Sequence, residues 1–147
     1  MTWVSKWFKA SEVACDRPAS QCDCSEETVH PALLDLADGA RTELGVPLVV
    51  FSGVRCSEKN KAVGGRPSSL HLPRDGVGHA LDLSYARRSL RTPVNMLRLY
   101  TLLESLSRQH GGCGIGLYGT FVHIDVRPKV GMKPARWQER FPWPRLS

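Results

Sequence analysis

Long apolar runs are missing from this 147-residue sequence, and so is a recognisable export signal. No stretch approaches the roughly 18 apolar residues needed to span a bilayer, so we expect no membrane span. The N-terminus lacks the basic start, apolar core and small-residue cleavage site of a secretory signal. We therefore expect synthesis in the cytoplasm without a signal peptide, so that a substrate outside the cytoplasm would be reached by another route.

Internal repeats and low-complexity tracts are absent as well. The length suffices to bury one core without help from disulfides. These two features predict a single domain over residues 1–147.

Signatures of nucleic-acid binding are also lacking. The sequence has no zinc-finger, helix-turn-helix or RNA-binding motif, and its basic residues are scattered apart from Arg87, Arg88 and Arg91. The formal net charge of +6 favours anionic partners, of which nucleic acid and anionic cell-wall polymers are two. We interpret this charge as a general surface field and expect no specific nucleic-acid partner.

The cysteines follow no standard metal-binding spacing. They are five in number: Cys15, Cys22, Cys24, Cys56 and Cys113. The Cys22-Asp23-Cys24 pair, with Cys15 and His30 nearby, suggests a structural metal, but it is not the Cys-x-x-Cys of zinc ribbons and has no second copy. We expect free thiols, or one local disulfide under oxidising conditions. The lack of an export signal favours a reducing compartment during synthesis.

Apolar periodicity predicts two helices and three strands. The helices begin at Pro31 and Pro93 and end before Gly45 and at about Arg108. The strands cover residues 46–51, 79–84 and 121–126. These elements alternate along the chain with loops.

The connecting segments carry most of the glycine and proline. Residues 52–78 predict a long loop, which in a compact domain is either functional or disordered. Because this loop contains Arg55, Asn60, Ser69 and His71, we favour a functional one. Residues 15–25 and 111–119 also predict loops, residues 1–9 an aromatic cluster that packs on the domain, and residues 141–144 an extended surface segment.

Polar side chains interrupt two of the predicted strands. Strand alternation places His123 and Asp125 on one face of the last strand, and Asp82 on one face of the strand before it. A buried carboxylate must be paired or bound to a metal, so these residues indicate a common site.

The residue types match a catalytic zinc site. His71, Asp82 and His123 supply two imidazoles and one carboxylate, which is the three-ligand set that leaves a position open for water. His79 is the alternative to His71. It is one residue out of phase with Asp82 on the strand and should point to the opposite face, so we prefer His71.

The order of these motifs is recognisable. It comprises Arg55 in Ser-Gly-Val-Arg, the Asn60 region, Val63-Gly64-Gly65, Ser69-x-His71, Gly78-x-Ala80-x-Asp82, Phe-Val-His123-Ile-Asp125 and Arg136-Trp137. Together the motifs resemble the zinc peptidases of the D-alanyl-D-alanine carboxypeptidase and endopeptidase family, which shares its metal site with the hedgehog signalling domain. The resemblance covers roughly residues 5 to 137. Its combined motifs are specific, although each alone is weak.

The resemblance implies a fold and a site. The fold would be a small α+β domain with a central antiparallel sheet flanked by helices, and Zn²⁺ would lie on His71, Asp82 and His123. Arg55 would hold a substrate carboxylate or polarise the carbonyl beside it, a task that suits its planar guanidinium. Further substrate contacts are expected from Ser69, Tyr118 and Trp137.

The general base is where this chain departs from better-known branches of the family. Some branches place Glu or Asp three residues before the last histidine, where this chain has Thr120, and another places His two residues before it, where this chain has Phe121. We therefore expect Asp125 to be the base that takes the water proton. The alternative is that Asp125 orients a zinc-bound histidine.

A second departure lies between the first two ligands, where Pro73-Arg74-Asp75-Gly76 extends the usual compact spacing. Asp82 still closes the motif. The resemblance then implies a monomeric zinc metallopeptidase that acts at the cell wall on the stem peptides or cross-links of peptidoglycan, as a carboxypeptidase or endopeptidase. A phage endolysin and an exported bacterial enzyme both fit. The alternative is a non-catalytic zinc-binding module of a phage structure or of the cell wall. Which bond is cut stays open.

Overall fold

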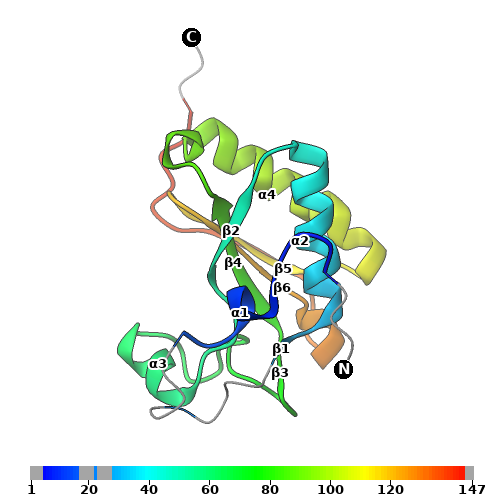
Figure 1. Cartoon of the computed structure of the whole chain (residues 1–147), viewed down its shortest axis with the longest axis vertical. Coiled ribbons are helices and arrows are strands. Elements are labelled where there is room, and N and C mark those ends of the chain that lie inside the picture. Colours follow the sequence, from blue (N-terminus) through cyan, green and yellow to red (C-terminus); the bar gives the residue numbers. More distant parts are fainter. Residues whose placement is uncertain (1–4, 17–21, 23–27, 145–147) are drawn as a thin grey trace.

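A five-stranded sheet with two long helices on one side forms the centre of the computed structural model (Figure 1), which describes residues 5–16, 22 and 28–144. The helices are α1 (Ala10–Val13), α2 (Pro31–Leu44), α3 (Ser57–Ala62) and α4 (Pro93–Ser107). The strands are β1 (Thr28–Val29), β2 (Leu48–Ser52), β3 (Val77–Gly78), β4 (Ala80–Tyr85), β5 (Gly114–Leu117), β6 (Val122–Asp125) and β7 (Ala135–Gln138). Three short 3₁₀ turns cover Arg88–Leu90, Arg108–His110 and Arg127–Val130.

The strand order of the main sheet is β2-β4-β6-β5-β7. The pairs β2-β4, β4-β6 and β6-β5 are antiparallel, whereas β7 pairs in parallel with β5 at the edge. A small parallel pair of β1 and β3 lies outside this sheet. The predicted α+β class is therefore confirmed, with the correction that the central sheet is mixed rather than wholly antiparallel.

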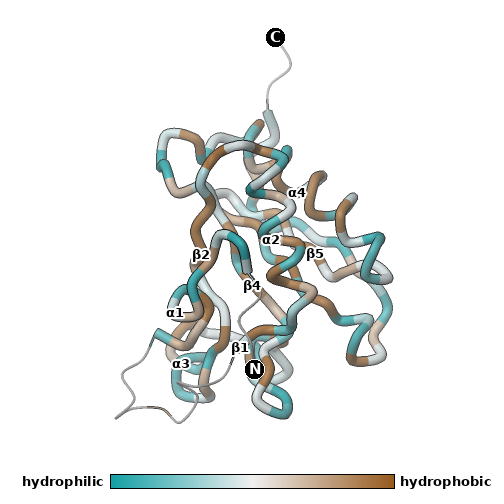
Figure 2. The backbone as a smooth tube through the Cα atoms, turned by 45° about the vertical axis from the view of Figure 1, so that its right-hand side comes forward, coloured by the Kyte–Doolittle hydropathy of each residue, from teal (hydrophilic) through white to brown (hydrophobic). Residues whose placement is uncertain are grey.

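One face of the sheet is apolar and carries the core. Leu81, Ile124 and Ile115 are neighbours across β4, β6 and β5, and all three are fully buried. Helices α2 and α4 pack against each other and contact these strands, and Figure 2 shows their hydrophobic positions in brown. The opposite face of the sheet is left for polar residues.

The two long helices form where the sequence predicts them. Helix α2 has Pro31 in its first turn and ends at Gly45, whose positive φ of 67° suits a residue without Cβ. Helix α4 begins with Pro93 after Thr92, whose hydroxyl accepts a hydrogen bond from the backbone N–H of Asn95. Local sequence signals thus start both helices and end α2.

Several connecting segments are more ordered than predicted. The presumed loop 52–78 contains α3 and β3, the glycine-rich segment 111–119 contains β5, and β7 lies where no element is expected. In the predicted aromatic cluster Phe8 is buried and Trp7 is 40% exposed, while Trp3 lies outside the described residues. In the tail, Phe141 is buried and Trp143 is exposed.

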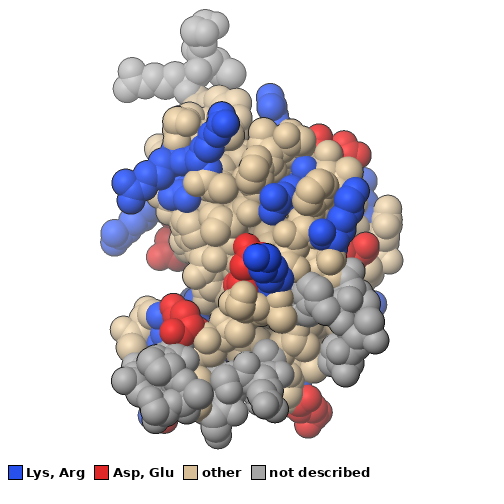
Figure 3. All heavy atoms as spheres, viewed as in Figure 1, with Lys and Arg blue, Asp and Glu red and all other residues tan. Residues whose placement is uncertain are grey.

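Among the described residues, no helix is both long and apolar enough to cross a membrane. Figure 3 shows Lys and Arg side chains at several separate places on the face in view, with Asp and Glu between them. The scattered pattern read from the sequence is therefore also the pattern on this face.

A histidine caps helix α2. His30 Nδ1 accepts a hydrogen bond of 3.1 Å from the backbone N–H of Ala32, so this nitrogen must be unprotonated. Burial, and then the positive fields of His79, Lys129 and His110, lower the pKa of His30. The cap therefore exists only in the neutral form.

This cap predicts a pH-dependent stability. Because the folded pKa of His30 lies below its ordinary value of 6.5, the cap is fully present above about pH 6.5 and is lost as the pH falls below it. His30→Asn keeps a capping oxygen that does not titrate, so it should match wild type at pH 7.5 and be the more stable variant at pH 5.5, by up to about 1 kcal/mol. Urea unfolding of both proteins at the two pH values measures this, and parallel pH profiles would contradict it.

Candidate metal centre

The site is built on one row of residues across the polar face of the sheet. Ser52 on β2 pairs with Asp82 on β4, Asp82 pairs with His123 on β6, His123 with Gly116 on β5, and Gly116 with Trp137 on β7. Paired residues of neighbouring strands point to the same face. The row is therefore fixed by strand register alone.

The third predicted ligand, His71, comes from the loop between α3 and β3 and meets Asp82 and His123 of this row. His71 Nε2 lies 3.3 Å from Asp82 Oδ1, and His123 Nδ1 lies 3.0 Å from the same oxygen. The potential ligand atoms of the three residues are all within 4.8 Å of one another. His71 and Asp82 are buried and His123 is half-buried.

The hydrogen bonds on the outer side of the rings decide what these nitrogens can bind. His71 Nδ1 lies 2.7 Å from the carbonyl oxygen of Gly53, which can only accept, so Nδ1 carries the proton. His123 Nε2 lies 2.9 Å from Asp125 Oδ2 and donates to it in the same way. In the neutral rings, His71 Nε2 and His123 Nδ1 then both present a lone pair to the carboxylate of Asp82.

Two ring lone pairs and a carboxylate that face one another suit a cation between them. His71 Nε2 is buried and has no hydrogen-bond partner among the described residues. Metal-bound histidines normally donate their other ring N–H to a carbonyl or carboxylate, as both rings do here. The residues present therefore fit a zinc ion, with two imidazoles and one carboxylate as its ligands.

The electrostatics favour positive charge at the same point. Burial alone would lower the pKa of His123, but hydrogen bonds to Asp125 and Asp82 outweigh it and raise this pKa to about 9. For Asp82, burial acts to raise the pKa, but the adjacent rings of His123 and His71 hold it well below its usual range. Both shifts arise because the buried carboxylates and the imidazoles lie next to one another, so that positive charge is favoured here.

Asp125 lies behind His123 and is completely buried. Its Oδ1 accepts hydrogen bonds from the Gly114 N–H at 3.2 Å and from Arg127 N and Nε at 3.1 and 2.9 Å. Its Oδ2 accepts from His123 Nε2 and, at 2.8 Å, from Arg127 Nη2. The hydrogen bonds from Gly114 and Arg127 fix the position of this carboxylate beside His123.

Arg55 and Ser69 lie beside the ligands. The Arg55 guanidinium donates to Ser52 Oγ at 3.0 Å, to Asn60 Oδ1 at 3.3 Å and to Asp82 Oδ2 at 3.4 Å. Two of its five N–H groups have no partner among the described residues. Ser69 Oγ accepts a hydrogen bond from the His71 backbone N–H and so orders the loop that carries this ligand.

A cavity of about 590 Å³ opens over the row, and all the predicted site residues line it. Its aromatic wall joins Trp137, whose ring centroid is 5.2 Å from that of His123, to Tyr118, which accepts a hydrogen bond from the Trp137 indole N–H at 3.0 Å. A Cβ at Gly116 would overlap the Trp137 indole. Glycine at position 116 therefore leaves room for the Trp137 ring.

These observations agree with the comparison to known families. A family model described as peptidase M15 matches residues 6–125 of the chain. The chain belongs to the peptidase M15 family. No curated protein matches it.

The peptidase M15 match covers the candidate ligands but not the whole cavity. The matched span contains His71, Asp82 and His123, but ends before Arg127 and β7. Metal dependence is a property of this peptidase family, so a metallopeptidase is indicated.

Two residues that line the M15 cavity are missed by the sequence analysis. Arg127 binds Asp125, and Glu139 lines the cavity with a carboxylate that has no hydrogen-bond partner among the described residues. The one trace of Arg127 in the sequence is the glycine at position 114, which is needed because a Cβ there would overlap the Arg127 and Asp125 side chains. Glu139 leaves no signal, because it follows a strand that the sequence does not reveal.

The alternative ligand His79 lies elsewhere. Its ring packs against His30, with ring centroids 5.6 Å apart, and it does not join the group of His71, Asp82 and His123. The sequence predicts this separation, because His79 is one residue out of phase with Asp82 and should point away from it.

Zinc binding tests the ligand set directly. We expect His71→Ala, Asp82→Ala and His123→Ala each to weaken zinc binding at this centre by about 100-fold or more, because each removes one of three ligands. His79→Ala is the matched control and should bind zinc like wild type. Isothermal titration of the metal-stripped proteins measures the affinities. Loss of binding in His79→Ala, together with retention in His71→Ala, would contradict the assignment.

Proposed function

We propose that this protein is a zinc-dependent peptidase that hydrolyses peptide bonds in the stem peptides or cross-links of bacterial peptidoglycan. The observation that carries the proposal is the pair of imidazole lone pairs that face one buried carboxylate at the floor of an open cavity, in a chain of the peptidase M15 family. The substrate class rests on the resemblance of the motifs to enzymes that act on such peptides.

The ligands in this proposal are His71, Asp82 and His123. Zinc at such a centre lowers the pKa of water toward neutrality and polarises a carbonyl. The chain's own contribution is to hold the two rings in one tautomer. The Gly53 carbonyl and the Asp125 carboxylate do so from the outer side of the site.

Substrate binding is assigned to the cavity walls. Arg55 faces the cavity with two N–H groups to spare, which suits a planar carboxylate held by two parallel hydrogen bonds. Tyr118 and Trp137 form the apolar wall beside the ligands. Ser69 borders the same space.

The group that accepts the proton must be a carboxylate that can reach water in the cavity. Asp125 is fully buried and both of its oxygens accept several hydrogen bonds. Glu139 lines the cavity and is exposed. We therefore assign the orienting role to Asp125 and the proton transfer to Glu139 Oε.

The setting of the reaction follows from the substrate. We place the action of this protein at the cell wall, as an endolysin of a phage or an exported enzyme of a bacterium, and we expect it to act as a monomer. The competing function is a zinc-binding module that does not cleave.

Incubation of the zinc-loaded protein with purified peptidoglycan separates the two functions. We expect fragments whose masses identify the bond, and a loss of at least about 100-fold in rate for Asp82→Ala, since this change removes a ligand. Arg55→Lys should raise KM by about tenfold or more, because lysine cannot form the paired contacts. Mass spectrometry of the released fragments is the measurement. If zinc-loaded wild type releases nothing from any peptidoglycan type, the proposal is wrong and the module is favoured.

A crossed pair of variants distinguishes the two carboxylates. Glu139→Gln should lower kcat by about 10²–10⁴-fold with zinc affinity unchanged, as expected for loss of a general base. Asp125→Asn should lower zinc affinity by about 10–100-fold, as expected for loss of an orienting partner, and should regain activity when zinc is in excess. The opposite pattern, with Asp125→Asn inactive at saturating zinc and Glu139→Gln active, would return the base to Asp125.

A further inference from the structure

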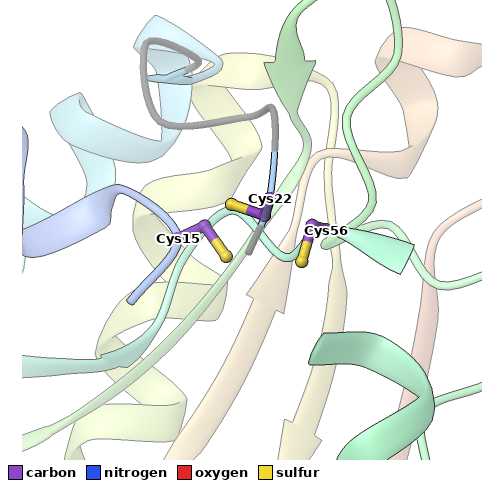
Figure 4. A group of neighbouring side chains, drawn as sticks. All are labelled: Cys15, Cys22 and Cys56. Carbon is purple, nitrogen blue, oxygen red and sulfur yellow. The ribbon is translucent and has the colours of Figure 1, made fainter. Parts of the chain in front are cut away.

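Three cysteines meet at a place that shares no residue with the candidate metal centre (Figure 4). Cys15 follows the end of α1, Cys22 lies on a separate stretch of chain, and Cys56 precedes α3. Their three sulfur atoms lie within 4.8 Å of one another. The fold thus gathers three thiols that are spread over the first part of the sequence.

The environment of the cluster is largely shielded from water. Cys15 and Cys56 are buried, and Cys22 is half-buried against the core. Cys56 Sγ accepts a hydrogen bond of 3.4 Å from the Lys59 N–H. Burial, together with the neighbouring thiols of Cys15 and Cys22, raises the pKa of Cys56. The Cys56 thiol is therefore protonated until a cation binds.

The number of sulfurs distinguishes a metal site from a disulfide. A disulfide joins two sulfurs and gives no reason for a third in the same place. Three converging thiolates are a preferred ligand set for zinc, which takes four ligands in structural sites and leaves one position here for a further group. We propose that Cys15, Cys22 and Cys56 form a second, structural zinc site.

Chemistry and position agree with a structural role. Each thiol releases its proton to solvent as its sulfur binds the metal, so no oxidant or reductant is needed. The site ties the N-terminal segment to the connection that follows β2, where Val54 N donates to the Val13 carbonyl and Arg55 N donates to the His71 carbonyl. That connection also includes Gly53, whose carbonyl orients His71. The thiol site would therefore stiffen the support of Arg55 and His71.

Cobalt spectroscopy of the full chain tests the site without any assay of cleavage. The chain is purified with a phosphine reductant, stripped of metal and titrated with Co²⁺. We expect a sulfur-to-cobalt charge-transfer band in the near ultraviolet, because only thiolate ligands give such a band. Cys15→Ser, Cys22→Ser and Cys56→Ser should each lose most of the band. Cys113→Ser, which alters a buried cysteine away from the cluster, should keep it, and so should His123→Ala.

Zinc content gives a second, independent measure. Wild type and Cys113→Ser should retain about two zinc ions per chain, and each variant of the three clustered cysteines about one, as expected for two separate sites. Absence of the cobalt band in wild type overturns the proposal, as does its persistence in Cys56→Ser or a disulfide between two of the three cysteines that survives treatment with the reductant. The cobalt spectrum of wild type tests the proposed site even if a variant misfolds. A failure to cleave peptidoglycan would contradict the proposed function but not the proposed thiol site.

Discussion

The buried carboxylate of Asp82 is the constraint around which the rest of the site is arranged. It lies in the second strand of the sheet order, where a lone charge would cost several kcal/mol, and two imidazoles approach the same oxygen. Each ring is fixed from behind by an acceptor, the Gly53 carbonyl for His71 and Asp125 for His123. A cation between them resolves the arrangement, because it satisfies one carboxylate and two lone pairs together.

Strand register and side-chain size extend this constraint to the cavity. The same row that pairs Asp82 with His123 continues through Gly116 to Trp137, so the ligands and the aromatic wall share one face. Glycine at position 116 gives the indole its space, and Gly114 does the same for Arg127 and Asp125. The site therefore depends on the two glycines of β5 as much as on His123 and Asp125 of β6.

The parts that the sequence predicts well are those with local signals. Helix α2 follows from apolar periodicity, Pro31 and Gly45, and the meeting of Asp82 with His123 follows from the phase of two apolar strands. Strands β5 and β7 escape prediction, since the glycines of one erase its alternation and the other forms by pairing in parallel with it. The convergence of Cys56 with Cys15 is equally hidden, because it depends on how β2 packs beside α1.

The position of β7 separates two properties of the molecule. This strand forms one edge of the sheet, lies beyond residues 6–125, carries Trp137 and is followed by Glu139, and both of these residues line the cavity. It contributes no metal ligand, and alternate residues of it face solvent. The terminal segment is therefore an exchangeable part: we expect a graft from another member of the family to replace both the aromatic wall and the proposed proton acceptor Glu139, while the row of Asp82 and His123 stays in place.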